Sequence, residues 1–139
     1  MSLSIRNRIP GTVTAVTADE AMATVKVRLD GGQHITAAVT AGAVKDLGIA
    51  PGIPVKALVK ATEVALATDH VEGISIRNQL AGTVAGIAVG GSMASVQVDV
   101  EGGGLVSVIT NEAVEALALA VGSPVVALIK STEILLSAT

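Results

Sequence analysis

The feature of the sequence that most constrains its fold is an internal repeat. The segment Ser4-Ile5-Arg6-Asn7 recurs as Ser75-Ile76-Arg77-Asn78, an offset of 71 residues. The offset holds as far as the glycine pairs Gly31-Gly32 and Gly102-Gly103 and is 70 afterwards. About 27 of roughly 66 aligned positions are identical, so the chain is a duplicated module. One structural unit therefore occurs twice.

The repeat divides the chain into two modules and a short linker. We predict a first module at residues 1–68, a linker at 69–72 and a second module at 73–139. Modules of about 66 residues bury only a modest core, yet 50% of all residues are apolar. We therefore expect the modules to pack on each other and on other copies of the chain.

Alternating apolar and polar residues predict β-strands in both modules. Val25, Val27 and Leu29 alternate with polar residues, and the segment 95–100 repeats the pattern. This period marks a strand with one buried face. The glycine pairs predict hairpin turns after these strands. The further predicted strands are 35–39, 55–59 and 64–66, and in the second module 105–109, 125–129 and 134–136.

One short helix follows the third strand of each module. Thr40 and Thr110 are suited to be the N-caps of helices at 41–47 and 111–119, and Gly48 is suited to end the first. Five short strands with a helix after the third are typical of an OB-like barrel. We therefore predict an all-β chain of two tandem OB-like five-stranded small β-barrels, each with one short helix.

Composition excludes several classes of partner. The chain has no Phe, Tyr, Trp or Cys, and its net charge is −3. Single-strand nucleic-acid binding by OB barrels uses aromatic stacking and a basic groove, so no nucleic-acid partner is expected. The uncharged stretch 79–98 is interrupted by glycines and polar residues, and residues 1–6 lack the basic segment and long apolar stretch of a signal peptide. We expect a cytoplasmic protein that binds no membrane.

No catalytic or metal-binding motif is present in the sequence. His34 aligns with Gly104 and His70 lies in the linker, so neither histidine is duplicated. The pair Asp19-Glu20 aligns with two glycines, which argues against an acid–base pair. We expect no enzyme, no metal-cation site and no cofactor.

Two basic residues of the second module stand out. Arg77 and Lys130 are its only basic residues, beside five acidic ones, and both have a counterpart in the first module. One interpretation is an ion pair between each lysine and Glu63 or Glu133. The other is a ligand site. Backbone N–H groups of the Ser-Ile-Arg segments, hydroxyls and one lysine per module would suit a tetrahedral oxyanion, whose oxygens only accept hydrogen bonds.

The order of these motifs resembles a known family. The Ser-Ile-Arg-Asn segment, a Gly-Thr-Val, a Gly-Gly hairpin, a Thr before a short helix and a closing Lys-[Ala/Ser]-Thr-Glu all occur twice. Together they look like tandem molbindins, molybdate-binding proteins whose Mop module also occurs as the transport-associated OB (TOBE) domain. The resemblance implies OB-like barrels assembled around threefold symmetry, with tandem forms as homotrimers.

The resemblance also implies a ligand set. Hydroxyl and amide donors would come from the two Ser-Ile-Arg segments, and a neighbouring module would complete each site with its lysine and the residue after it. Oxyanions would also bind near the threefold axis at Thr40 and Thr110, where helix N-termini expose amides. The implied main-site residues are Ser4, Ile5, Arg6, Lys60, Ala61, Ser75, Ile76, Arg77, Lys130 and Ser131.

Three functions remain open at this point. The first is intracellular binding of molybdate and tungstate for storage and homeostasis, at sites between the modules of an oligomer. The second is an oxyanion-sensing regulatory module that acts on a molybdate transporter or a transcription partner. The third is a structural β-barrel assembly without a ligand.

Overall fold

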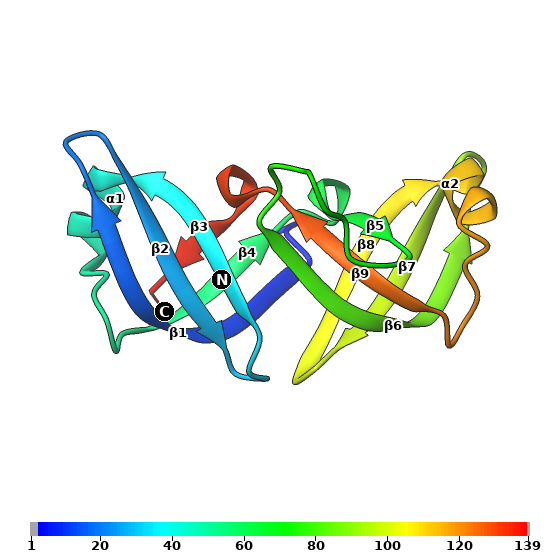
Figure 1. The fold of residues 1–139 in the computed structure, drawn as a ribbon, viewed down its shortest axis with the longest axis horizontal. Helices are drawn as coiled ribbons and strands as arrows, with labels where there is room; N and C mark the ends of the chain where they lie inside the picture. Colours follow the sequence, from blue (N-terminus) through cyan, green and yellow to red (C-terminus); the bar gives the residue numbers. More distant parts are fainter. Residues whose placement is uncertain (1–2, 139) are drawn as a thin grey trace.

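Two half-barrels lie side by side along the long axis of the molecule, with one short helix at each far end (Figure 1). The computed structural model describes residues 3–138. Each half-barrel is a five-stranded antiparallel sheet. The predicted all-β fold of two five-stranded units with one short α-helix each is confirmed.

The two copies of the repeat contain the same elements in the same order. Each has three strands, a helix, a strand, a one-turn 3-10 helix and a final strand. The first copy comprises β1 (Asn7–Ala18), β2 (Met22–Leu29), β3 (His34–Thr40), α1 (Ala41–Leu47), β4 (Pro54–Val59), η1 (Ala61–Glu63) and β5 (Ala65–Ala67). The second comprises β6 (Asn78–Val89), β7 (Met93–Val100), β8 (Gly103–Thr110), α2 (Asn111–Ala116), β9 (Pro124–Ile129), η2 (Ser131–Glu133) and β10 (Leu135–Ser137).

The helix caps follow the sequence prediction in the first copy and differ in the second. Thr40 caps α1, and Gly48 ends it in a left-handed conformation with φ 65°. Thr110 caps α2, but this helix ends at Ala116 rather than at residue 119. The chain leaves the helix there because Ala118, aligned with Gly48, adopts a positive φ of 51°.

The last strand of each copy lies in the sheet of the other copy. β10 pairs with β4, where Leu136 lies opposite Ala57, and β5 pairs with β9, where Leu66 lies opposite Ala127. The sheet orders are β10-β4-β1-β2-β3 and β5-β9-β6-β7-β8. The predicted boundaries 1–68 and 73–139 describe the repeat in the sequence, and as independent folding units they stay a prediction.

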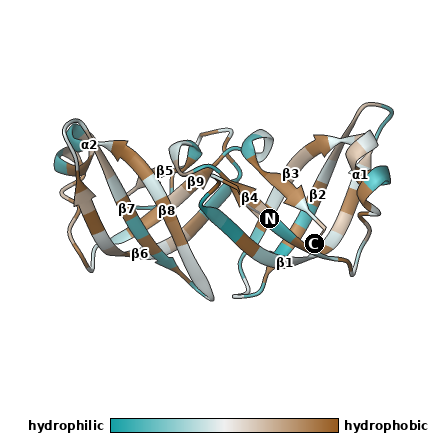
Figure 2. Cartoon of the chain, turned by 180° about the vertical axis from the view of Figure 1, so that it is seen from behind, coloured by the Kyte–Doolittle hydropathy of each residue, from teal (hydrophilic) through white to brown (hydrophobic). Residues whose placement is uncertain are grey.

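One hydrophobic cluster runs through both half-barrels. It includes Val25 and Val27 from β2 and Val96 and Val98 from β7, all fully buried as their alternation predicts. Figure 2 shows apolar and polar residues alternating along several strands. In the part of the chain that is described, no helix is long and apolar enough to cross a membrane.

The two glycine-rich turns meet at the middle of the molecule (Figure 1). A Cβ built on Gly31 would overlap the backbone carbonyl of Glu101, and one built on Gly102 would overlap Gly31. In the second copy the turn lies at Glu101-Gly102, one residue earlier than predicted, because Gly103 already belongs to β8. The absence of a side chain at Gly31 and Gly102 therefore allows the two turns to approach each other closely.

Candidate functional site

The strand register brings each Ser-Ile-Arg segment next to the lysine of its own copy. Asn7 at the start of β1 lies opposite Val59 at the end of β4. Arg6 and Lys60 are the residues just beyond this pair, so they leave the sheet at the same end. The equivalent pair in the second copy is Asn78 and Ile129.

Arg77 and Lys130 leave the second sheet together for the same reason, and both side chains are exposed. Two segments that the sequence separates by more than fifty residues are thus joined twice by the same register.

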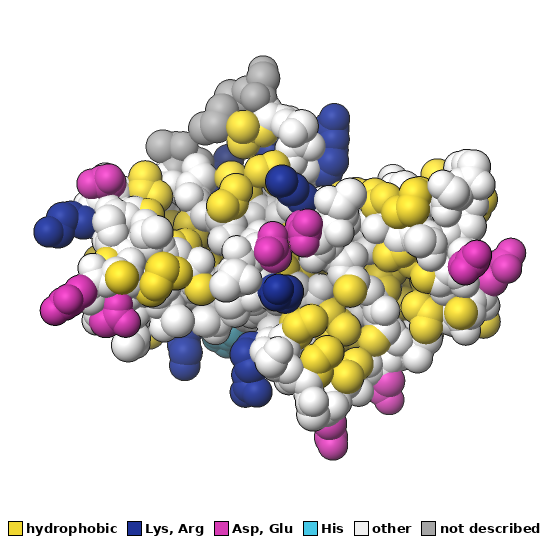
Figure 3. Space-filling model, turned by 90° about the horizontal axis from the view of Figure 1, so that it is seen from above, with side chains coloured by type: hydrophobic (Ala, Val, Ile, Leu, Met, Phe, Trp, Pro, Cys, Tyr) yellow, Lys and Arg dark blue, Asp and Glu magenta, His cyan; other side chains and the backbone are white. Residues whose placement is uncertain are grey.

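A hollow of about 300 Å³ lies beside this strand end in the second copy. Ile76 and Lys130 line it together with Thr62 and Glu63 of η1. Because η1 packs against β8, the first copy supplies part of the wall. The resemblance implied that each lysine completes a site of a neighbouring module. Within one chain, Lys130 instead lies beside its own Ser-Ile-Arg segment, and the neighbouring copy contributes η1. Figure 3, which views the molecule from above, shows Lys/Arg and Asp/Glu side chains close together near the middle, between hydrophobic patches.

Two duplicated asparagines hold the copies together directly behind the Ser-Ile-Arg segments. Asn7 Nδ2 donates to the Val106 carbonyl over 2.9 Å, and the Val106 N–H donates to Asn7 Oδ1 over 2.7 Å. Asn78 makes the same pair of bonds with Thr36, at 2.9 and 2.7 Å. Each amide thus pairs with the free edge of β8 or β3. Both asparagines are only 2% exposed, so these bonds fix where β1 and β6 begin.

The two copies differ in the residue that follows the lysine. Asn78 Nδ2 also donates to Ser131 Oγ over 3.4 Å. Because Ser131 Oγ accepts this bond, its own hydrogen can be donated to another acceptor. The first copy has Ala61 at this position and no hydroxyl. The strand ends of the two copies therefore offer different numbers of donors.

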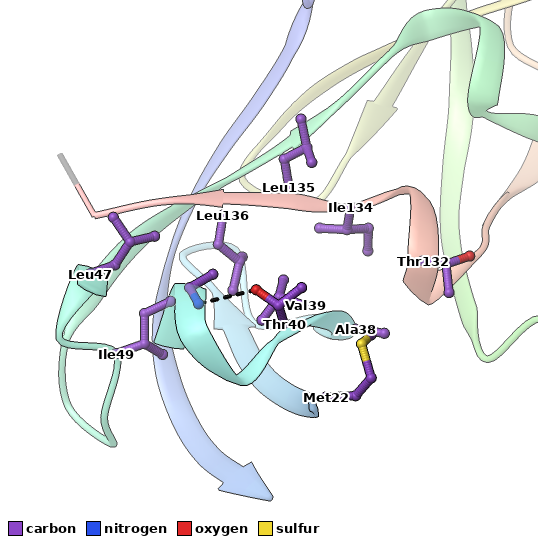
Figure 4. A pocket seen from close by; sticks show the side chains of 11 residues that line it. Met22, Ala38, Val39, Thr40, Leu47, Ile49, Thr132, Ile134, Leu135 and Leu136 are labelled. Carbon is purple, nitrogen blue, oxygen red and sulfur yellow. Dashed lines mark hydrogen bonds between the residues drawn. The ribbon is translucent and has the colours of Figure 1, made fainter. Parts of the chain in front are cut away.

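The two threonines predicted to bind further oxyanions cap the helices. Thr40 Oγ1 accepts from the Ala43 N–H and Thr110 Oγ1 from the Ala113 N–H, each over 3.1 Å. Thr40 borders a hollow of about 320 Å³ whose other walls are mostly apolar, among them Leu136 of the exchanged strand (Figure 4). An oxyanion role for Thr40 and Thr110 stays a prediction.

The ion-pair interpretation of the duplicated lysines has no counterpart in the structure. Between residues 3 and 138, neither Lys60 nor Lys130 forms an ion pair with Glu63 or Glu133. Over the same residues, no group of three or more His, Cys, Asp or Glu side chains could hold a metal ion.

Comparison with known proteins identifies the module. The TOBE domain model matches residues 3–66 and again residues 74–136. The chain belongs to the TOBE domain family. The two TOBE matches end inside β5 and β10, the strands that lie in the sheet of the other copy. The family module in the sequence and the sheet in space therefore do not coincide.

Two curated relatives match nearly all of the chain. It is 37% identical to the molybdenum-pterin-binding protein MopA of Rhodobacter capsulatus over 139 residues, 99% of this chain and 52% of MopA. It is 32% identical to the molybdenum transport protein ModE of Herbaspirillum seropedicae, again over 99% of this chain and 52% of ModE. The chain thus spans about half the length of these relatives.

A solved structure matches the whole TOBE chain. The cytoplasmic molybdate-binding protein ModG, in a form with molybdate bound, has a TM-score of 0.96 and 38% sequence identity, with 100% of both chains covered. The resemblance to tandem molybdate-binding proteins and the two-unit fold are confirmed.

Proposed function

We propose that this chain binds molybdate, and tungstate at the same sites, for storage and homeostasis in the cytoplasm. The observation that carries the proposal is the register that sets a Ser-Ile-Arg segment beside a lysine in both copies. The full-length similarity to ModG, a cytoplasmic molybdate-binding protein, supports it.

The proposed ligand set of each copy consists of its Ser-Ile-Arg segment, its exposed lysine and the residue after the lysine. In the second copy it is Ser75, Ile76 and Arg77 with Lys130-Ser131. In the first copy it is Ser4, Ile5 and Arg6 with Lys60-Ala61. Hydroxyl and backbone N–H donors suit the four oxygens of molybdate, which only accept, and the lysine offsets part of its double negative charge. This is a binding function that requires neither a cofactor nor a reaction step.

We further propose that the sites lie between modules of a homotrimer. Large apolar side chains are exposed on the single chain, among them Val121 at 70%, Val89 at 67% and Leu135 at 51%. Burying such side chains between subunits would be favourable. Sedimentation should give a mass near three chains. A stable monomer at micromolar concentration would contradict both the trimer and the sites between subunits.

Equilibrium dialysis with competing oxyanions tests the proposed function. Tungstate should displace bound molybdate, because the two ions are nearly the same size. Sulfate is smaller and would lose hydrogen bonds in a cage built for molybdate. Phosphate is partly protonated at neutral pH and would set a proton against a donor. Sulfate binding as tight as molybdate binding would contradict a site matched to molybdate.

A regulatory role is the second candidate. It is favoured by the similarity to the molybdenum transport protein ModE over 99% of this chain. An affinity capture with the molybdate-loaded chain would distinguish the two roles. Recovery of a transporter or a DNA-binding protein that depends on molybdate would favour regulation over storage.

A further inference from the structure

The two Ser-Ile-Arg segments lie just before β1 and β6, outside any strand or helix. In the second copy, one side chain holds this irregular backbone. Gln79 Nε2 donates to the Ile76 carbonyl over 3.3 Å and to the Val71 carbonyl over 2.9 Å. Gln79 Oε1 accepts from the Val71 N–H over 2.9 Å. Gln79 thus ties both the segment and the linker to the start of β6.

The first copy has a different side chain at the aligned position. Arg8 Nε donates to the Ile5 carbonyl over 3.3 Å, and Arg8 Nη2 donates to the Leu3 carbonyl over 3.2 Å. Arg8 and Gln79 are 71 residues apart, as the repeat requires, and each follows the buried asparagine directly. Both copies therefore hold the isoleucine carbonyl from the same position with different chemistry.

A hydrogen bond to the isoleucine carbonyl also fixes the direction of the N–H group of the following arginine. The Ile76 carbonyl and the Arg77 N–H belong to one peptide plane, and the chain contains no cis peptide bond among its described residues. In a trans peptide the C=O and N–H point in opposite directions. A bond from Gln79 to the carbonyl therefore directs the Arg77 N–H away from the Gln79 side chain. The same geometry relates Arg8, the Ile5 carbonyl and the Arg6 N–H.

We propose that Arg8 and Gln79 are positioning residues for oxyanion binding, acting through the backbone amides of Arg6 and Arg77. The inference rests on the proposed function, since it concerns the same donors. An amide fixed before the ligand arrives loses less conformational freedom on binding, which raises affinity without adding a contact.

The two anchors should not be equally strong. Gln79 is half-buried and takes part in three hydrogen bonds, whereas Arg8 is exposed and takes part in two. Gln79 and Arg77 also border a hollow of about 280 Å³ between the segment and the linker. Loss of Gln79 should therefore affect the second-copy site more than loss of Arg8 affects the first-copy site.

The experiment compares removal of each anchor with exchange between the copies. Gln79→Leu should weaken molybdate binding at second-copy sites by about tenfold, the worth of roughly one hydrogen bond. It should also speed hydrogen exchange at the Arg77 amide without ligand. Gln79→Arg, which installs the first-copy residue, should restore both. Arg8→Gln should keep binding while Arg8→Leu weakens it, which separates positioning from loss of charge.

A second glutamine, Gln33, provides the matched control. Gln33 Nε2 donates to the Ala81 carbonyl and Gln33 Oε1 accepts from the Ala81 N–H, each over 3.2 Å, so it also ties backbone between the copies. Among the described residues, its side chain makes no hydrogen bond to a Ser-Ile-Arg segment. Gln33→Leu should lower thermal stability and leave both molybdate affinity and Arg77 amide exchange unchanged.

The outcomes separate this inference from the proposed function. If the unaltered chain binds no molybdate, the proposed function fails and this inference fails with it. If the unaltered chain binds molybdate and Gln79→Leu binds equally well, only this inference fails, and Gln79 merely anchors the linker. Should Gln79→Leu not fold, the exposed Arg8 decides: equal binding by Arg8→Leu and Arg8→Gln would overturn the inference.

Discussion

The first copy of the repeat holds its N-terminal segment with Arg8, whereas the second holds the same carbonyl with Gln79. At the junction between the copies, by contrast, both use asparagine and both bury it. The junction has a near-twofold relation, so one residue type satisfies both sides. The segments face different surroundings, and each copy meets the same requirement with a different donor.

The comparison changes what identity between the copies means. Gly31 and Gly102 are identical because the two turns touch, and Asn7 and Asn78 because each binds a strand edge of the other copy. Identity alone therefore does not mark a ligand residue. For Lys60 and Lys130 the assignment rests on the register, on their exposure and on the chemistry of the segments beside them.

The largest expected effect is a loss of stability when a buried residue beside β10, the strand that lies in the other copy's sheet, is truncated. Ile134 belongs to the second copy and is 1% exposed, yet it lines the hollow at Val39 and Thr40 of the first copy. Ile134→Ala should lower the free energy of unfolding by about 2–5 kcal/mol. Protection from hydrogen exchange should fall first in β3 and β4, in the other copy's sheet.

The matched variant is Val64→Ala in the first copy. Val64 is 2% exposed and its carbonyl accepts from Ser107 Oγ of β8 over 2.5 Å. Val64→Ala should lower the free energy of unfolding by less than Ile134→Ala does, because it removes a smaller side chain. Protection from hydrogen exchange should fall first in β8 and β9. If each variant loosened the sheet of its own copy instead, the exchange of β5 and β10 would be wrong.

The lysine of the second copy provides the next effect. Lys130→Met keeps most of the apolar stem, so little packing is lost. It removes a charge-assisted hydrogen bond worth about 1.5–3 kcal/mol, or roughly tenfold to a hundredfold in molybdate affinity at second-copy sites. Calorimetry should show the first-copy sites partly intact, and Lys60→Met should show the reverse. Unweakened sites combined with a drop in thermal stability would indicate a structural ion pair.

The missing hydroxyl of the first copy can be restored. Ala61→Ser gives the first-copy strand end the donor that Ser131 gives the second, so molybdate should bind there more tightly by about 0.5–1.5 kcal/mol. Ser131→Ala should weaken the second-copy sites by a similar amount. Each variant gives the two copies the same residue after the lysine. Titration of either variant should therefore show molybdate affinities at the two kinds of site that are more alike than in the unaltered chain. No change in either variant would remove Ser131 from the ligand set.

The smallest effect concerns the β1–β2 turn. Asp19 Oδ1 accepts from the Ala21 and Met22 N–H groups, each over 2.9 Å, and these bonds hold the pKa of Asp19 below its usual 3.8. The aligned residue of the second copy is Gly90. Because the folded-state pKa is lowered, the stabilisation is present above about pH 3.8 and is lost as the pH falls through the folded value.

Thermal melts of Asp19→Gly and the unaltered chain check this linkage. The variant should melt slightly lower at pH 7, and the difference should shrink at pH 2. A difference that persisted unchanged at pH 2 would assign the effect to the backbone freedom of glycine rather than to the carboxylate.

Much of the fold could be predicted from local patterns. The alternation around Val25 and Val96 marks strands, and Thr40 and Gly48 mark the ends of a helix, because burial and capping are local requirements. The exchange of β5 and β10 could not be predicted. Leu66 and Leu136 show the same pattern whether they pair within a copy or between copies, so only the register in space decides.

The candidate site was predictable only in part. The duplicated Ser-Ile-Arg segments and lysines are visible in the sequence, and the structure explains their proximity by the pairs Asn7–Val59 and Asn78–Ile129. Arg8 and Gln79 are missed because comparison of the copies finds identical residues, not different residues with one function. A search for polar residues at aligned positions, whatever their type, would have found them.

Counting the molybdate ions bound to the intact assembly tests the central claim most directly. Native mass spectrometry should be applied to the unaltered chain and to the double variant Lys60→Met/Lys130→Met at equal molybdate concentration. We expect several ions on an unaltered oligomer near the mass of three chains, and loss of the ions at the paired strand ends in the double variant. A double variant that retained every ion at undiminished affinity would contradict the assignment of these strand ends as the oxyanion sites.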